Sequence, residues 1–393
     1  MRRAVDGRWI VLGALGCYFV ALAITGPGTF WREVGVPHLS PAFLDMHTIT
    51  SGWECTRRGL EVVPVNPCDP KGRPMNYPRL WMAPAFLGIG QGASFALGVA
   101  AVVMFLASVL AVVGRLHPVE GIVYTAALCS PAVMLGIERG NVDLVVFVLL
   151  ALALLVFRRS PAGRAVGHGL LLFAAMLKLF PAFGWGPILR QRPQFAIVGA
   201  VGVALVFAVY VGATLDDIRE IRRVSPRVDG YSYGLGPLAD LARPGWASRG
   251  AFEAAAVGVG IGAAALVAWT RRRLADAGDV RSADAFCVGA GVYCGSYLFF
   301  YNFDYRLIFL LLTLPLLLRS IRVRGARLPF PGFGLLLVLA ALWVGSSLPP
   351  FHASQRYDEL VNWLLFVYLG AGLLLELAPR PLRPEVVHSG GAW

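Results

Sequence analysis

Polar side chains that could take part in chemistry gather at three places where apolar segments meet polar loops. Asp45 stands early in the longest polar interval, which covers 41–82. The other two places are the short turns at 138–143 and 301–306, and Lys178 lies close to Pro181 inside an apolar segment. Carboxylates can act as general bases, and cations can bind phosphate. Ionisable residues at or within membrane segments are costly, so these are candidate site residues: Asp45, Glu138, Arg139, Asn141, Asp143, Lys178, Asn302, Asp304 and Arg306.

The composition excludes an ordinary soluble domain. The chain has 393 residues, of which 57% are hydrophobic and 15% are charged, and its mean hydropathy is +0.65. These values predict a polytopic membrane protein whose main partner is the lipid bilayer. The net charge of +12 is mostly arginine. The positive charge lies in short loops, where it sets the topology, and we therefore expect no nucleic-acid partner.

Apolar runs predict an all-α fold with about ten full spans and one re-entrant helix pair. Arg2, Arg3 and Arg8 precede the first run and predict a cytoplasmic amino terminus. We interpret that run as an uncleaved anchor rather than a signal peptide, because no clear cleavage site follows it. The expected spans are 9–24, 93–113, 120–137, the stretch after Asn141 to 157, 195–212, 251–269, 283–300, 307–318, 330–344 and 360–377.

The segment 163–188 decides the topology. It is apolar but contains Lys178 and Pro181. If it crossed once, the later basic positions, among them Arg272 and Arg322, would lie outside, against the positive-inside rule. We therefore predict a hairpin that breaks at 178–181. The cytoplasmic amino terminus already places the long first loop (26–91) on the extracytoplasmic face, and the hairpin places the second loop (213–249) on the same face.

The two outer loops add further candidates. Cys55 and Cys68 share the first loop, and they either form a disulfide or are free thiols. Tyr231 opens a glycine-rich stretch in the second loop, where it could stack on a sugar or simply lie at the membrane interface.

Each candidate also has a purely structural explanation. Asp45 and Asn141 could cap helices. Glu138 with Arg139, and Asp304 with Arg306, could be ordinary ion pairs at segment ends. Asp143 and Lys178 could pair only to make both tolerable in lipid.

Four short motifs give the first half of the chain a family resemblance. They are FLDMH at 43–47, NYPRL at 76–80, GNVD at 140–143 and LKLFP at 177–181. In their order and spacing they resemble glycosyltransferase family 87 of the GT-C superfamily, the polyprenol-phosphate-mannose-dependent mannosyltransferases. The family commonly has Tyr-Pro-Pro where this chain has Tyr77-Pro78-Arg79.

The resemblance implies one GT-C-like transmembrane domain over 1–393 and an inverting sugar transfer. The donor would be a polyprenyl-phosphate sugar, with mannose expected, and the acceptor an outward-facing glycolipid or glycan. Asp45 would be the general base, and the donor phosphate would be bound by Lys178, Arg306 and Arg139. Substrate-binding residues would be Tyr77, Arg79, Glu138, Asn141, Asp143, Asn302, Asp304 and Tyr231.

The same resemblance implies a multi-pass protein of the plasma membrane with its active site on the extracytoplasmic face. We expect neither a cofactor nor a metal, because a lipid monophosphate has less charge to neutralise than a diphosphate.

Two other classes of function compete with this interpretation. A transporter or lipid flippase would use the buried charges as a pathway, but the chain shows no convincing internal repeat of the kind common in transporters. Another membrane enzyme, such as an acyltransferase or a ligase of lipid-linked glycans, is the third alternative. The six histidines lie mostly in or near loops, which disfavours an acyltransferase.

Overall fold

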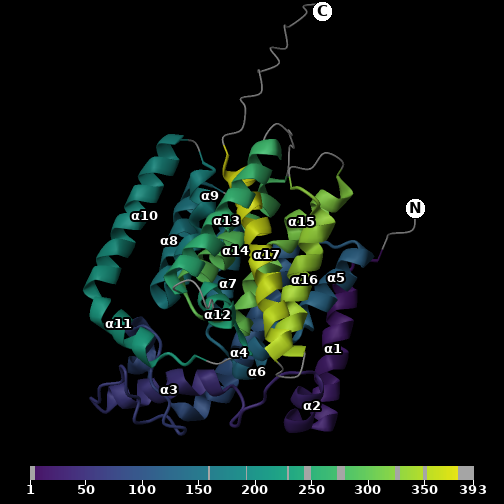
Figure 1. The fold of residues 1–393 in the computed structure, drawn as a ribbon. Coiled ribbons are helices and arrows are strands. Elements are labelled where there is room, and N and C mark those ends of the chain that lie inside the picture. The colour runs from purple at the N-terminus through teal and green to yellow at the C-terminus, as the bar shows by residue number, and fades with distance from the viewer. Residues whose placement is uncertain are drawn as a thin grey trace, which may run out of the picture.

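The computed structural model describes residues 5–157, 160–191, 193–227, 230–242, 249–271, 279–323, 328–347 and 352–378. Across these residues the chain is almost entirely helical (Figure 1). Among them, five helices are long and apolar enough to cross a membrane, or six if one bent pair is counted as a span. The described chain therefore has the character of a helical membrane protein.

Most predicted spans coincide with single helices. These are α1 (Arg8–Thr25), α4 (Ser94–Val113), α7 (Asp143–Val156), α10 (Pro193–Ala213), α13 (Arg249–Arg271), α14 (Val280–Phe299), α16 (Pro331–Ser347) and α17 (His352–Leu377). The predicted inner loop at 272 and parts of the predicted loop 213–249 lie outside the described residues.

Two predicted spans are not single helices. The segment 120–137 consists of α5 (Pro118–Leu128) and α6 (Pro131–Arg139), which are bent by 57° relative to each other. The segment 307–318 is divided between the 3-10 helix η4 (Asp304–Leu312) and α15 (Leu314–Arg322). Each second helix has a proline in its first two positions. Proline lacks the N–H that would continue the preceding helix, so each proline begins a new one.

The segment 26–91 forms a layer across one end of the bundle, which we call the α3 end (Figure 1). It contains α2 (Pro27–Glu33), α3 (Leu44–Arg57), η1 (Arg79–Leu87) and η2 (Gln91–Ala93). The layer has its own small core around Ile49, Trp53 and Met75. Cys55 and Cys68 form a disulfide within it, which is the first of the two alternatives that the sequence left open.

The chain turns back at the predicted break. The helix α8 (Pro161–Lys178) ends at Leu179, whose φ is 53°, and η3 (Phe180–Trp185) and α9 (Gly186–Leu189) lead away from it. His168 on the incoming arm and Gln191 after the returning arm are hydrogen-bonded at 2.7 Å. The segment therefore enters and leaves at the same end of the bundle.

That end, which we call the α5 end, lies opposite the α3 layer (Figure 1). The N–H of Gly7, just before α1, donates to the carbonyl of Leu116 at 2.8 Å. Arg322 at the end of α15 forms an ion pair with Glu120 of α5. The start of α1 and the basic end of α15 thus lie together, as the positive-inside rule requires if this end is cytoplasmic.

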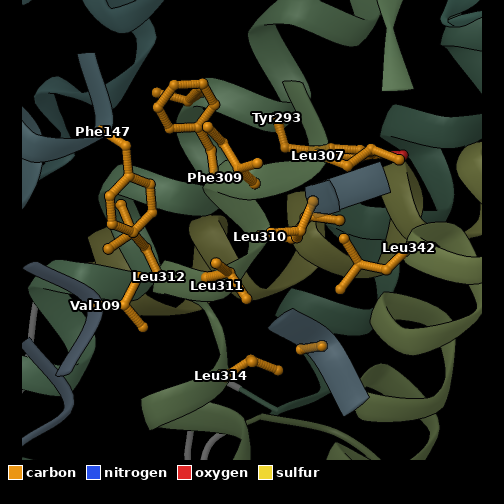
Figure 2. Close-up of a cluster of buried hydrophobic side chains, with 14 of the residues drawn as sticks. Val109, Phe147, Tyr293, Leu307, Phe309, Leu310, Leu311, Leu312, Leu314 and Leu342 are labelled. Carbon is orange, nitrogen blue, oxygen red and sulfur yellow. The ribbon is translucent and has the colours of Figure 1, made fainter. Parts of the chain in front are cut away.

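The core holds the site-bearing elements in place. Figure 2 shows Phe147 of α7, Phe309 of η4 and Tyr293 of α14 packed in one cluster with aliphatic side chains of α4, η4 and α16. A short antiparallel ladder adds the second loop to this frame, because β1 (Ser232–Tyr233) pairs with β2 (Asn302–Phe303). Two further helices flank β1 in sequence, α11 (Leu215–Val224) and α12 (Leu235–Ala242).

Candidate functional site

Asp45 is fixed in the first turn of α3 by the packing of its neighbour Phe43. Phe43 has a left-handed backbone, with φ of 57°. Its side chain fills the space beside Gly98 and Gly140, where an added Cβ would come within 2.4 and 2.7 Å of Phe43 atoms. No larger residue fits at either glycine without displacing Phe43. The start of α3 is therefore tied to both α4 and the turn that precedes α7.

The Asp45 carboxylate has two polar neighbours. Its Oδ2 accepts a hydrogen bond from Nδ2 of Asn141 at 2.6 Å. Its Oδ1 lies 3.4 Å from Nη1 of Arg73. The Asp45 side chain is 18% exposed, so solvent or a ligand can reach it.

Arg73 is held mainly by a different carboxylate. Its Nη2 donates to Oδ2 of Asp69 at 2.8 Å and to the carbonyl of Leu44 at 2.6 Å. The Asp69 side chain is buried and also accepts from the backbone N–H of Lys71. Because the contact of Arg73 with Asp69 is much shorter than that with Asp45, Asp69 balances most of the positive charge of Arg73.

A second, deeper cluster is joined to Asp45 through Asn141. The side-chain oxygen of Asn141 accepts from the backbone N–H of Asp143 at 2.9 Å. Oδ1 of Asp143 lies 2.9 Å from Nζ of Lys178, and its Oδ2 lies 3.5 Å from Nε of Arg306. The two cations are each 10% exposed and the carboxylate 1%. This cluster carries one more positive than negative charge.

Aromatic rings and one amide complete the surroundings of these cations. Nζ of Lys178 lies 4.8 Å from the ring centre of Tyr77, and the guanidinium of Arg306 lies 4.3 Å from that of Phe180. Both arrangements are cation–π contacts. Arg306 also donates to Oδ1 of Asn302, whose amide nitrogen donates to the Ser296 carbonyl at 2.9 Å. The ladder between β1 and β2 thus positions Arg306.

The cations form part of the wall of a cavity of about 570 Å³, a size common for ligand sites. Asp45 does not line this cavity, whereas Tyr77 does. Burial, followed by the charge of Asp45, raises the pKa of Tyr77 well above its ordinary value, so this phenol stays neutral. Lining residues include Tyr77, Lys178, Phe180, Ile218, Ile221, Arg222, Arg227, Arg249, Phe299, Tyr305 and Arg306.

Several predicted site residues lie elsewhere. Glu138 accepts from Nδ1 of His38 and from the backbone N–H of Leu39, both at 2.9 Å, and lies 3.1 Å from Nε of Arg139. Arg139 is therefore paired at the end of α6 and does not line the cavity. Arg79 does not line the cavity and pairs with Glu61 at 2.8 Å and Asp217 at 2.5 Å.

Asp304 and Tyr231 also stand apart from the Asp45 network. Oδ2 of Asp304 approaches Gly345 of α16, on the side where Asp358 of α17 also approaches it. The backbone N–H of Asp304 donates to the carbonyl of Tyr231 at 3.0 Å, so Tyr231 contributes its backbone to this turn. The predicted convergence therefore holds for Asp45, Asn141, Asp143, Lys178, Tyr77, Asn302 and Arg306.

Sequence reasoning did not single out Arg73 or Tyr305. Tyr305 could have been found, because it precedes Arg306 in the same turn. Nothing in the sequence distinguishes Arg73, since it is one of several basic residues in a polar loop and lies 28 residues from Asp45.

Comparison of this chain with protein-family models, with curated proteins and with solved structures gave no match. Within the described part of the chain, no group of three or more His, Cys, Asp or Glu side chains is arranged to hold a metal ion.

Proposed function

We propose that this protein is a membrane glycosyltransferase of the GT-C type, similar to family 87. It moves a sugar, with mannose expected, from a polyprenyl-phosphate donor to an outward-facing glycolipid or glycan acceptor. About ten spans and the re-entrant pair would form its single domain in the plasma membrane, with the α3 end outside. One observation carries the proposal: the partly exposed Asp45 carboxylate is joined through Asn141 to Asp143, whose own carboxylate faces two cations on a cavity wall.

In this proposal Asp45 removes the proton from the acceptor hydroxyl. The acceptor oxygen attacks the anomeric carbon, and the bond from that carbon to the phosphate oxygen breaks. The polyprenyl phosphate leaves with the bonding electron pair, and the configuration inverts. A carboxylate oxygen has two lone-pair sites, so the bond from Asn141 leaves Asp45 able to accept a proton.

The charge balance of the deeper cluster favours an anionic donor. Lys178 and Arg306 share the single carboxylate of Asp143, which leaves one positive charge uncompensated. A phosphate brought to these cations would receive charge-assisted hydrogen bonds, and these strengthen as negative charge develops on the leaving group.

The decisive experiment compares wild type with Asp45→Asn. Purified protein is reconstituted in liposomes and incubated with radiolabelled polyprenyl phosphate mannose and a membrane lipid extract. Loss of a positioned general base predicts transfer that is about 10²–10⁴-fold slower. Asp216→Asn, in an exposed ion pair of α11, is the matched control and should transfer at the wild-type rate.

Equal transfer by wild type and Asp45→Asn would remove Asp45 as the base. Movement of the intact donor across the bilayer without any transfer to an acceptor would instead identify a transporter or flippase.

A further inference from the structure

The arginines in and just after the short helix α11 differ in whether they have an ion-pair partner. Arg219 lies 3.0 Å from Asp216, and Arg223 forms an ion pair with Glu220. Arg222 lies on the same helix, and Arg227 follows shortly after its end. Both of these line the mouth of the cavity, and within the described residues neither has a carboxylate at ion-pair distance.

Each of the other cations that line the cavity has a carboxylate at ion-pair distance. Lys178 and Arg306 share Asp143, and Arg249 lies 2.6 Å from Asp240 and 2.9 Å from Glu253. Among the described residues that line the cavity, the cations with no carboxylate at ion-pair distance are therefore Arg222 and Arg227, and they are not the pair that would receive the donor phosphate.

The neighbouring helix indicates what lies beside these arginines. α10 is apolar over Ala196–Ala213, and its side chains Val198, Val201 and Leu205 are largely exposed, as in a helix that faces lipid. Figure 1 shows α10 along the outer edge of the bundle, with α11 continuing from its end. The chain thus passes from a lipid-facing helix straight into a strongly amphipathic one, which is the pattern of a helix at a membrane surface.

α11 is also fixed in orientation. Asp217 in its first turn accepts from Nε of Arg79 at 2.5 Å, which ties the helix to the layer at the α3 end. Ile218 and Ile221 line the cavity together with Arg222. The helix therefore presents apolar side chains and an uncompensated cation to the same opening.

We propose that Arg222 and Arg227 form a binding site for the phosphate of an anionic phospholipid headgroup at the mouth of the cavity. Guanidinium groups donate bidentate, charge-assisted hydrogen bonds to phosphate oxygens, and arginines near a membrane surface attract anionic lipids. The acyl chains of that lipid would lie along the exposed apolar side of α10. This site is separate from sugar transfer, and its existence does not depend on the proposed function.

The test measures lipid binding to the full-length protein in phosphatidylcholine nanodiscs. Phosphatidylglycerol is titrated in, and its retention is followed by native mass spectrometry. The double variant Arg222→Gln/Arg227→Gln should bind it about 30-fold more weakly, the effect expected for two arginines at an anionic membrane surface. The control Arg219→Gln/Arg223→Gln makes the same change in charge on the same helix and should bind as wild type.

An equal loss of phosphatidylglycerol binding in both double variants would overturn the site. It would mean that binding depends only on the total positive charge of this segment and not on Arg222 and Arg227. Unchanged binding in both would overturn it as well. Decaprenyl phosphate and inorganic phosphate are titrated as further arms. If only decaprenyl phosphate binding depends on Arg222 and Arg227, the pair belongs to the donor and the phospholipid assignment is wrong. Circular dichroism shows that each variant is folded.

A failure of the lipid-binding proposal can be distinguished from a failure of the proposed sugar transfer. Binding of phosphatidylglycerol needs no acceptor and no turnover. Asp45→Asn tests transfer and leaves Arg222 and Arg227 unchanged.

Discussion

Asp45 and Asp143 are joined through one asparagine but have different surroundings. Asp45 is 18% exposed and has one cation at 3.4 Å, whereas Asp143 is 1% exposed and faces two cations. A carboxylate that takes a proton from a substrate must be reachable and not tightly ion-paired. These surroundings suit Asp45 to act on an acceptor and Asp143 to make two buried cations tolerable.

The Asp143 cluster predicts an order of stability among single variants. Asp143→Asn leaves Lys178 and Arg306 without their shared carboxylate, and breaking a buried ion pair in this way costs about 3–5 kcal/mol. Lys178→Met should cost less, because Asp143 still faces Arg306. Thermal unfolding in one detergent, followed by intrinsic fluorescence, should therefore give the lowest midpoint for Asp143→Asn. A lower midpoint for Lys178→Met would contradict this account of the charges.

At the scale of elements, apolar runs predicted where most helices lie but not how two of them break. The segments 120–137 and 307–318 are as apolar as a continuous span. Hydropathy alone therefore does not predict that a second helix begins at Pro131 and another just before Pro315. The hairpin at 178–181 was predictable because the positive-inside rule forbids the alternative.

Contacts between helices and loops that are distant in the chain were harder to predict from the sequence. The ion pair of Arg79 with Asp217 joins positions 138 residues apart, and no local periodicity indicates it. The substrate role expected for Arg79 follows from its place after Tyr77-Pro78, whereas its tie between α11 and the α3 layer is visible only in the structure. The candidate site was predictable where its residues lie in short turns between helices, and it was not where a loop folds back, as at Arg73.

The returning arm of the hairpin depends on one buried cation. Arg190, just after α9, lies 3.0 Å from Asp284 of α14 and 2.6 Å from Glu376 of α17. Cys287 of α14 is buried, and a Cβ added at Gly186 of α9 would lie 3.0 Å from its Cβ, so α9 covers this thiol. Opening of α9 should therefore expose Cys287.

We predict that Arg190→Met accelerates alkylation of Cys287. Loss of a cation that two buried carboxylates contact should loosen α9 and raise the maleimide rate on the order of tenfold or more. The assay uses a Cys17→Ser/Cys129→Ser background and locates the adduct by peptide mass spectrometry. Arg219→Met, which removes an exposed ion pair, is the control and should leave the rate unchanged. Continued protection of Cys287 in Arg190→Met would show that α9 is held by packing alone.

At the scale of the whole molecule, the two ends of the bundle differ in content. The α5 end carries the start of α1, the basic end of α15 and the Arg190 cluster. The α3 end carries the disulfide, Asp45 and the tip of the hairpin with Lys178. Disulfides persist in oxidising compartments and basic loops favour the cytoplasm, so from both features we propose the same orientation, with the α3 end outside.

Labelling of intact cells tests that orientation. Asp216 of α11 has a 96% exposed side chain, and Val323 at the end of α15 is 39% exposed. In a background without free cysteines, Asp216→Cys should react with a membrane-impermeant maleimide, whereas Val323→Cys should react only after permeabilisation. Reaction of both in intact cells would mean that the chain between α11 and α15 does not return to the cytoplasm. The opposite pattern would place Asp45 in the cytoplasm, where a donor presented on the outer face could not reach it.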